Sequence, residues 1–258
     1  MGANFTVTGP VWVFSIDRPT RRNALDSETS MNLTFMLQQA HADPLCRAVV
    51  ITGAGPWFCS GSDMKEFAGL TPVQMEEIEQ KKAELIRTIG VVDIPVIAAV
   101  SGFALGGGLA LAAACDLVVS DPAARWHMAE VKNGWLPPWG ITPILARTGA
   151  VRSRAVVWGA AALDAAQACR MGLVDEISGA GGALALACER ADELARLPPE
   201  SASSVKPYLR RIADATAPEA DRLAGELFLR HCDSEPARKT LAKFGGASPA
   251  GAKDSNVR

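Results

Sequence analysis

Apolar and polar positions follow two different repeats along the first two thirds of the chain. Short, almost uniformly apolar runs predict buried strands, and apolar residues that recur every three or four positions predict helices. The predicted strands are Val11–Ile16, Ala48–Gly53, Ile94–Val100 and Asp116–Ser120. Because helical patterns separate these runs, their order indicates an α/β fold with parallel strands.

Residues with strong positional preferences set the limits of the predicted helices. Asp26 or Ser27 can cap the first helix. Thr71 and Pro72 supply the N-cap and first position of a longer helix, which Gly90 would end. After residue 182 the pattern is helical throughout, so the chain should end in a helical region.

Composition gives no support for a nucleic acid or a membrane as the main partner. The 258-residue chain is 48% hydrophobic and 21% charged, with a formal net charge of −2. These values are typical of a globular protein with a sizeable core, and they favour neither nucleic acid nor an anionic membrane as a partner. Its longest apolar runs include Val96–Val100 and Leu109–Cys115, far short of the ~20 residues of a membrane span. The N-terminal residues also lack the pattern of a secretory signal.

Cysteine and histidine usage points to a reducing compartment. The six cysteines form no C-x-x-C pair and most stand beside apolar residues, while the three histidines are scattered. This pattern predicts buried free thiols rather than disulfides, and no metal site. We therefore expect a cytoplasmic protein.

Two stretches place small residues between an apolar run and a predicted helix. SGFALGGGLALAAACD spans Ser101–Asp116, and FCSGSDMKEF spans Phe58–Phe67, with a helix expected from Asp63. The first NH groups of a helix have no internal acceptor, and glycine lets a ligand approach the backbone closely. Two such junctions could converge on one carbonyl oxygen as an oxyanion hole. Close packing of helix on strand explains the first stretch equally well, and that stretch matches no phosphate-loop or dinucleotide pattern.

Four segments, in order and spacing, resemble the crotonase superfamily, that is, the enoyl-CoA hydratase/isomerase family. They are IDRPTRRNALD, ITGAGPWFCSGSDMKEF, PVIAAVSGFALGGGLALAAACDLVVS and RMGLVDEI. The resemblance implies an α/β spiral of ββα turns in residues 1–195, which binds a CoA thioester and acts on it. It also implies a C-terminal helical region in residues 196–258 that joins chains into homotrimers or dimers of trimers, with a disordered tail from about residue 247.

The resemblance assigns roles to individual positions. The NH groups of Ser62 and Gly107 would form the oxyanion hole. Coenzyme A would enter as part of the acyl-CoA substrate, with no prosthetic group and no metal. The residues expected to contact coenzyme A are Ser60 through its carbonyl group, the backbone around Ala24, and the side chains of Lys65, Arg21 and Arg22. Solvated surface charge is an equal alternative for these three cations.

Acid–base chemistry rests on one glutamate. Hydratases of the family carry two, and the position of the first is occupied here by Ala110, which cannot transfer a proton. The second matches Glu130, in a turn crowded by tryptophans that could raise its pKa. One base and an oxyanion hole favour double-bond isomerisation of an enoyl-CoA. Hydration without the second glutamate, or decarboxylation or another lyase reaction, remains an alternative; an RNA-binding or catalytically inactive relative is a further one.

The acyl pocket would be lined by aromatic and small residues, which hints at a short or cyclic acyl group. Its expected members are Trp135, Pro137, Trp139, Ala110 and, by analogy with the family, Phe244. Core packing is an equal explanation of the tryptophans. His127 follows Trp126, and a histidine in that setting is more often packed and hydrogen-bonded than catalytic.

Overall fold

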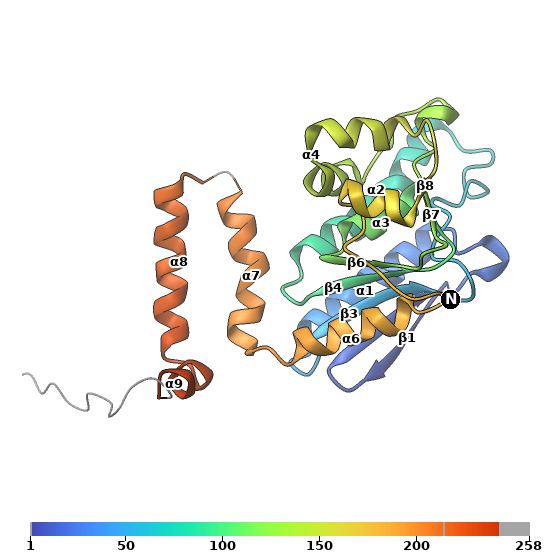
Figure 1. Cartoon of the computed structure of the whole chain (residues 1–258). Coiled ribbons are helices and arrows are strands. Elements are labelled where there is room, and N and C mark those ends of the chain that lie inside the picture. Colours follow the sequence, from blue (N-terminus) through green and yellow to red (C-terminus); the bar gives the residue numbers. More distant parts are fainter. Residues whose placement is uncertain (1, 214, 243–258) are drawn as a thin grey trace, which may run out of the picture. The chain divides into compact units, whose positions relative to one another are not determined.

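The computed structural model describes residues 2–213 and 215–242. Alternating strands and helices build a six-stranded sheet in the order β1-β2-β3-β4-β6-β9 (Figure 1). Strand β1 is antiparallel to β2, and all other neighbours in this sheet are parallel. Its strands are β1 Ala3–Thr8, β2 Val11–Ile16, β3 Ala48–Gly53, β4 Val96–Val100, β6 Leu117–Ser120 and β9 Glu176–Ile177. The predicted α/β class and parallel sheet are confirmed.

A second, smaller sheet explains why the chain turns as a spiral. It has the order β5-β7-β8, with β5 Phe103–Leu105, β7 Arg125–His127 and β8 Leu163–Asp164. Strands β4 and β5 are consecutive, as are β6 and β7, yet each pair sends one strand to each sheet. These two repeats each contribute a strand to the main sheet, a strand to the small sheet and then a helix.

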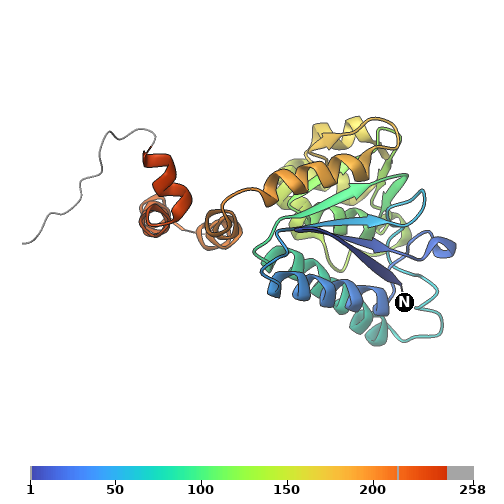
Figure 2. The same ribbon diagram turned by 90° about the horizontal axis from the view of Figure 1, so that it is seen from below.

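Helices cover both faces of the main sheet (Figure 2). Helices α1 and α2 pack against each other, and α1 contacts β1 and β2, whereas α6 contacts β2, β3, β4 and β6. Successive side chains of a strand point to opposite faces of the sheet. Alternate residues of each strand therefore face the helices on one side of the sheet or on the other. The helices of this part are α1 Ser27–Ala42, α2 Pro72–Val91, α3 Gly107–Ala114, α4 Ile141–Trp158, α5 Ala165–Met171 and α6 Ala183–Ala195.

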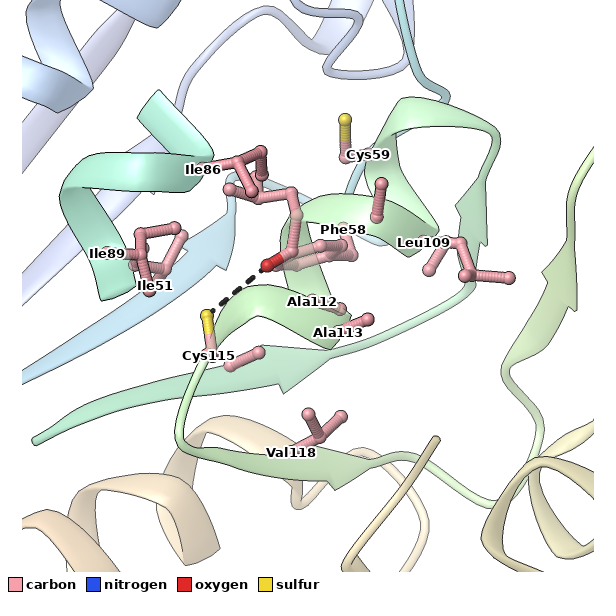
Figure 3. Packing of buried hydrophobic residues seen from close by; sticks show 14 of the residues in the cluster. Ile51, Phe58, Cys59, Ile86, Ile89, Leu109, Ala112, Ala113, Cys115 and Val118 are labelled. Atoms are coloured by element: carbon pink, nitrogen blue, oxygen red, sulfur yellow. Dashed lines mark hydrogen bonds between the residues drawn. The ribbon is translucent and has the colours of Figure 1, made fainter. Parts of the chain in front are cut away.

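The larger core cluster lies between the sheet and helices α1, α2 and α3. Figure 3 shows the part of it to which α2 and α3 contribute. Phe58 and Ile51 are fully buried there, and α3 contributes an almost entirely apolar surface. The Cys115 thiol lies 3.4 Å from the carbonyl oxygen of Leu111. The Arg147 guanidinium donates to the carbonyl groups of Ala113 and Cys115, and so supplies a positive charge at the C-terminal end of the helix. The apolar run after the glycines therefore makes α3 a central, buried helix.

Three local features differ from the expectations. Strand β1 was not predicted, because its exposed alternating residues carry little apolar signal. The helix expected from Asp63 is wrong: residues 64–69 form a series of turns, since the Asp63 carboxylate accepts hydrogen bonds from the Lys65 NH and from Arg18 instead of capping a helix. Helix α2 passes Gly90 and ends at Val91.

Helix α4 contains the break that the sequence suggested between two helices. Gly149 has φ +71° and ψ +167°, outside the helical region, so one element contains two helical segments. Glycine adopts a positive φ at little cost because it has no Cβ.

Contacts divide the chain at Leu197 into two compact units, and the second begins at Pro198. This second unit contains α7 Pro199–Ile212, α8 Ala217–Cys232 and α9 Glu235–Ala242. The Tyr208 hydroxyl donates to the carbonyl of Ala220 and joins α7 to α8. Within the described part of the chain, no helix combines the length and hydropathy that a membrane crossing requires. The tail predicted from residue 247 lies outside the described residues.

Candidate active site

Three chain segments that are far apart in sequence lie side by side at one edge of the small sheet. Residues 22–25 bridge to the 60–62 turn, because the Leu25 NH donates to Gly61 and the Asp63 NH donates to Leu25. The same turn continues from Cys59, which pairs with Ala104 at the start of the glycine-rich stretch. The two turns that the sequence singled out are therefore in contact.

Each glycine of the GGG run serves a different purpose. Gly106 has φ +51° and ψ −122°, a conformation that a side chain would strain, and a methyl group there would lie 2.6 Å from Glu130 Oε1. At Gly107 a methyl group would lie 2.5 Å from the Trp139 ring, and at Gly108 it would lie 2.4 Å from the Cys59 carbonyl oxygen. Gly108 therefore permits close packing of the helix on the Cys59 backbone, while Gly106 and Gly107 lie beside Glu130 and Trp139.

The NH groups of Ser62 and Gly107 belong to adjoining turns. Because Gly61 and Asp63 make the hydrogen bonds to Leu25, the NH of Ser62 points away from that residue. Gly107 is the first residue of α3, where an NH has no acceptor within the helix. A methyl group on Gly61 would lie only 3.1 Å from the Gly107 nitrogen, so the turns touch at these residues.

Glu130 projects its carboxyl group toward these turns. It precedes the short 3₁₀ helix η2, Val131–Asn133, and is half-buried. Its Oε2 is buried and accepts no hydrogen bond from the residues that the structure describes. Burial raises the pKa of the Glu130 carboxyl, and the Glu79 carboxylate raises it further, against the lowering effect of backbone NH groups and His127. Glu130 is thus a buried carboxyl group with a raised proton affinity.

Trp139 and Ala110 lie next to the start of helix α3. Trp139 is 8% exposed and its ring lies against Gly107. Ala110 is buried one turn further along α3, and its methyl group would lie 2.3 Å from a methyl group on Gly140. The position that would hold a second glutamate is therefore filled by a small apolar residue packed against the Trp139 loop.

Sequence reasoning missed a second carboxylate at this site. Glu79 of α2 is 9% exposed; its Oε1 accepts hydrogen bonds from the Ser62 hydroxyl at 3.0 Å and from Lys82 at 2.6 Å. Its Oε2 accepts the indole NH of Trp139. The available signal was helical spacing: both Glu79 and Lys82 fall on the apolar stripe that includes Ile78.

The residues expected to bind coenzyme A border the same turns. The Ser60 NH donates to the carbonyl of Arg22, and the buried Ala24 accepts a hydrogen bond from Arg18 at its carbonyl. Arg21, Arg22 and Lys65 are exposed. The structure thus brings Ser60, Ala24, Arg21 and Arg22 together, and the exposed Lys65 follows the same turn.

The remaining predicted pocket residues have different surroundings. Pro137 is buried, but Trp135 is 45% exposed and lines a separate surface cavity of about 570 Å³ over α4. Phe244 lies outside the described residues. His127 Nε2 is 2.8 Å from the carbonyl oxygen of Gly159, so this ring is engaged in packing and hydrogen bonding.

Possible metal ligands are dispersed. Over residues 2–213 and 215–242, no group of three or more histidine, cysteine, aspartate or glutamate side chains is arranged to hold a metal ion. Cys46, Cys59 and Cys115 are buried free thiols. Burial raises the pKa of the Cys59 thiol to about 12, so this residue of the site is not a nucleophile at neutral pH.

The chain is similar to known proteins in sequence and in fold. The family model for enoyl-CoA hydratase/isomerase matches residues 7–248. An enoyl-CoA isomerase/hydratase of Mycosarcoma maydis is 30% identical over 194 residues, covering 71% of each chain. A short-chain-enoyl-CoA hydratase of Clostridium acetobutylicum is 33% identical over 171 residues, covering 66% of each.

A solved structure extends the likeness to the fold. The crystal structure of an enoyl-CoA hydratase from Polaromonas sp. JS666 superposes with a TM-score of 0.87 at 27% identity, covering 94% of this chain and 96% of that one. The matched region includes the two contacting turns and Glu130. The chain is an enzyme of the enoyl-CoA hydratase/isomerase family.

Proposed function

We propose that the enzyme isomerises the double bond of an enoyl-CoA, with Glu130 as its base and the NH groups of Ser62 and Gly107 as its oxyanion hole. The observation that carries this proposal is the buried Glu130 carboxyl group against Gly106, beside the turn contact between Gly61 and Gly107. Two backbone donors polarise the thioester carbonyl and stabilise the enolate that forms when an α proton leaves.

The reaction needs one proton to move between two carbons. Glu130 removes a proton from C2 of a 3-enoyl-CoA, and the electron pair delocalises into the thioester as a dienolate. The same carboxyl group then returns the proton to C4, and the double bond lies between C2 and C3. The raised pKa of Glu130 suits both steps, because its two protonation states come closer in free energy near neutral pH.

Hydration is a second candidate, favoured by the names of two relatives and by a second carboxylate at the site. Hydratase is the name of the Clostridium and Polaromonas relatives, and Glu79 brings a second carboxylate to the site. Ala110 argues against it, because it offers no group to hold water. Glu79 replaces that glutamate poorly, since it already accepts hydrogen bonds from Ser62, Lys82 and Trp139.

Two substrates separate the candidates. Purified enzyme is incubated with a 3-enoyl-CoA and, separately, with crotonyl-CoA, and products are resolved by chromatography. Rapid formation of the 2-enoyl-CoA with slow hydration supports isomerisation; rapid hydration of crotonyl-CoA eliminates the one-base mechanism. Glu130→Gln should lose activity by about 10²–10⁴-fold, and an unchanged rate would remove Glu130 as the base.

The surroundings of the site support a CoA thioester as substrate. Arg21, Arg22 and Lys65 are exposed near Ser60, where phosphate groups could be met by cations. Replacing both arginines by Gln should raise KM more than it lowers kcat. We also propose assembly into trimers through the helices after Pro198, in the cytoplasm, with light scattering of the purified chain as the test of assembly.

A further inference from the structure

Helix α2 carries a buried ion pair that the proposed reaction leaves unexplained. The side chain of Lys82 has no exposed surface, and its Nζ lies 2.6 Å from Glu79 Oε1 and 3.7 Å from Glu66 Oε2. The ammonium group also lies 4.9 Å from the centre of the Phe67 ring. Burying charged groups is costly even when they are paired, so a purely structural helix would be expected to present apolar residues here.

The Glu79 carboxylate is oriented by groups on three sides. Lys82 lies on the same helix as Glu79, Ser62 lies in the 60–62 turn, and Trp139 lies in the loop before α4. Hydrogen bonds to an ionised acceptor are about twice as strong as neutral ones. A carboxylate held by three donors is suited to fixing the positions of its partners.

Two of these partners border the space in which the acyl group would lie. The NH of Ser62 is a proposed oxyanion donor, and its hydroxyl is the group that Glu79 holds. The ring of Trp139 fills the space beside Gly107, the other proposed donor. Glu79 therefore links Ser62 and Trp139 through a single side chain.

Accordingly, we propose that Glu79 is a positioning residue that holds Ser62 and Trp139 in register around Gly107, so that the indole ring limits the pocket to short acyl groups. This inference rests on the proposed function, because it assumes that the acyl group lies beside Gly107. Lys82 is the counter-charge that lets the Glu79 carboxylate occupy a buried position.

The charge of Glu79 also acts on the base. The charged or titratable groups that act on Glu130 are Glu79 from α2 and His127 from β7. Removing the Glu79 charge while Glu130 is unchanged should make Glu130 easier to deprotonate. The acid limb of the kcat/KM profile should then move to lower pH, a change that a loss of packing alone would not produce.

The test compares four variants with the wild-type enzyme. Glu79→Gln removes the carboxylate charge and leaves the Lys82 ammonium buried without it. The double variant Glu79→Gln with Lys82→Met removes both buried charges, so it should fold even if an unpaired ammonium group prevents folding of the single variant. Trp139→Phe keeps an aromatic ring but removes the NH donor. The matched control is Glu84→Gln with Lys81→Met, a pair at the same spacing on the exposed side of α2. Each is assayed with a short-chain and a long-chain enoyl-CoA across pH.

We expect the double variant to lose about 10- to 100-fold in kcat/KM for the short-chain substrate and to lose most of its preference for short over long chains. Trp139→Phe should show the same loss of preference, and the control pair should resemble wild type. A folded double variant with wild-type chain-length preference would overturn the proposal.

The failure of the proposed function gives a different result. If the wild-type enzyme converts no enoyl-CoA, the isomerase and hydratase proposals both fail. The positioning role is then tested by NMR, through the hydrogen exchange of the Trp139 indole NH. Its resonance is assigned as the one that is missing in the spectrum of Trp139→Phe. Loss of its exchange protection in the double variant supports the role of Glu79, and unchanged protection removes it.

Discussion

Gly108→Ala tests whether close packing of α3 sets the geometry of the oxyanion hole. The added methyl group would lie 2.4 Å from the Cys59 carbonyl oxygen and 2.9 Å from its carbonyl carbon. Ordinary contact begins near 3.4 Å, so helix and strand must separate by about 1 Å. The Cys59 backbone resists this movement, because its NH donates to Phe103 and its carbonyl accepts from Leu105.

The overlap gives the expected size of the effect. Overpacking against backbone atoms costs about 3 kcal/mol at the upper end of the usual range. The better helix propensity of alanine returns at most about 1 kcal/mol, which leaves a net loss of about 2 kcal/mol. For a chain of this size the melting temperature should fall by roughly 4–8 °C. A shift of about 1 Å at the adjacent Gly107 NH should also lower kcat/KM by up to about 100-fold.

Calorimetry and the enoyl-CoA assay measure these two quantities. Gly90→Ala is the control, since Gly90 is also helical and has no atoms within 4 Å of an added methyl group. It should raise the melting temperature by about 1–4 °C through helix propensity and leave activity unchanged. If Gly108→Ala melted at or above the wild-type temperature with full activity, the packing argument would be refuted.

Other consequences can be checked with standard measurements. Burial raises the pKa of Glu130 in the folded state, so the wild type should lose stability as pH rises from the ordinary glutamate pKa of about 4.3 through the raised value. Urea titrations should therefore find Glu130→Gln more stable than the wild type at neutral pH, and this difference should disappear near pH 4. Gly106→Ala should reduce kcat strongly, since its methyl group would displace the Glu130 carboxylate; a wild-type kcat would contradict that contact. Thr71→Ala removes the capping box of α2 and should cost about 1 kcal/mol of unfolding free energy. In native protein, Cys46 and Cys59 should react with iodoacetamide far more slowly than in urea, because burial raises the pKa of each thiol to about 12.

The main sheet was predictable because most of its strands are marked by apolar runs in the sequence. The runs from Val11 and Ala48 are almost wholly apolar, since parallel strands are covered on both faces. Strand β1 was not, because it lies at an edge and exposes Phe5. The helix expected at Asp63 failed for a tertiary reason: its carboxylate binds Arg18, a partner 45 residues away.

The candidate site divides in the same way. Gly107 and Glu130 stand in local patterns that a family resemblance identifies without coordinates. Glu79 does not, because its importance arises from contacts with Ser62 and Trp139, which lie 17 and 60 residues away. A single helical pattern indicates that a charge falls on the apolar stripe, but only the fold reveals what that charge meets.

The proposed oxyanion donors are main-chain atoms, and this has a consequence for how the gene can vary. A small residue in place of Ser62 keeps the NH and loses only the hydroxyl contact with Glu79, so it should cost less activity than a replacement of the neighbouring glycines. Gly61, Gly106 and Gly108 have no side chain to lose, yet any replacement collides with backbone or with Glu130. In a saturation mutagenesis scan, the largest losses of activity should therefore occur at glycines, which carry no functional group. New acid–base chemistry should arise most readily from changes of the surrounding side chains, such as those at positions 79, 110 and 130, while the main chain stays the same.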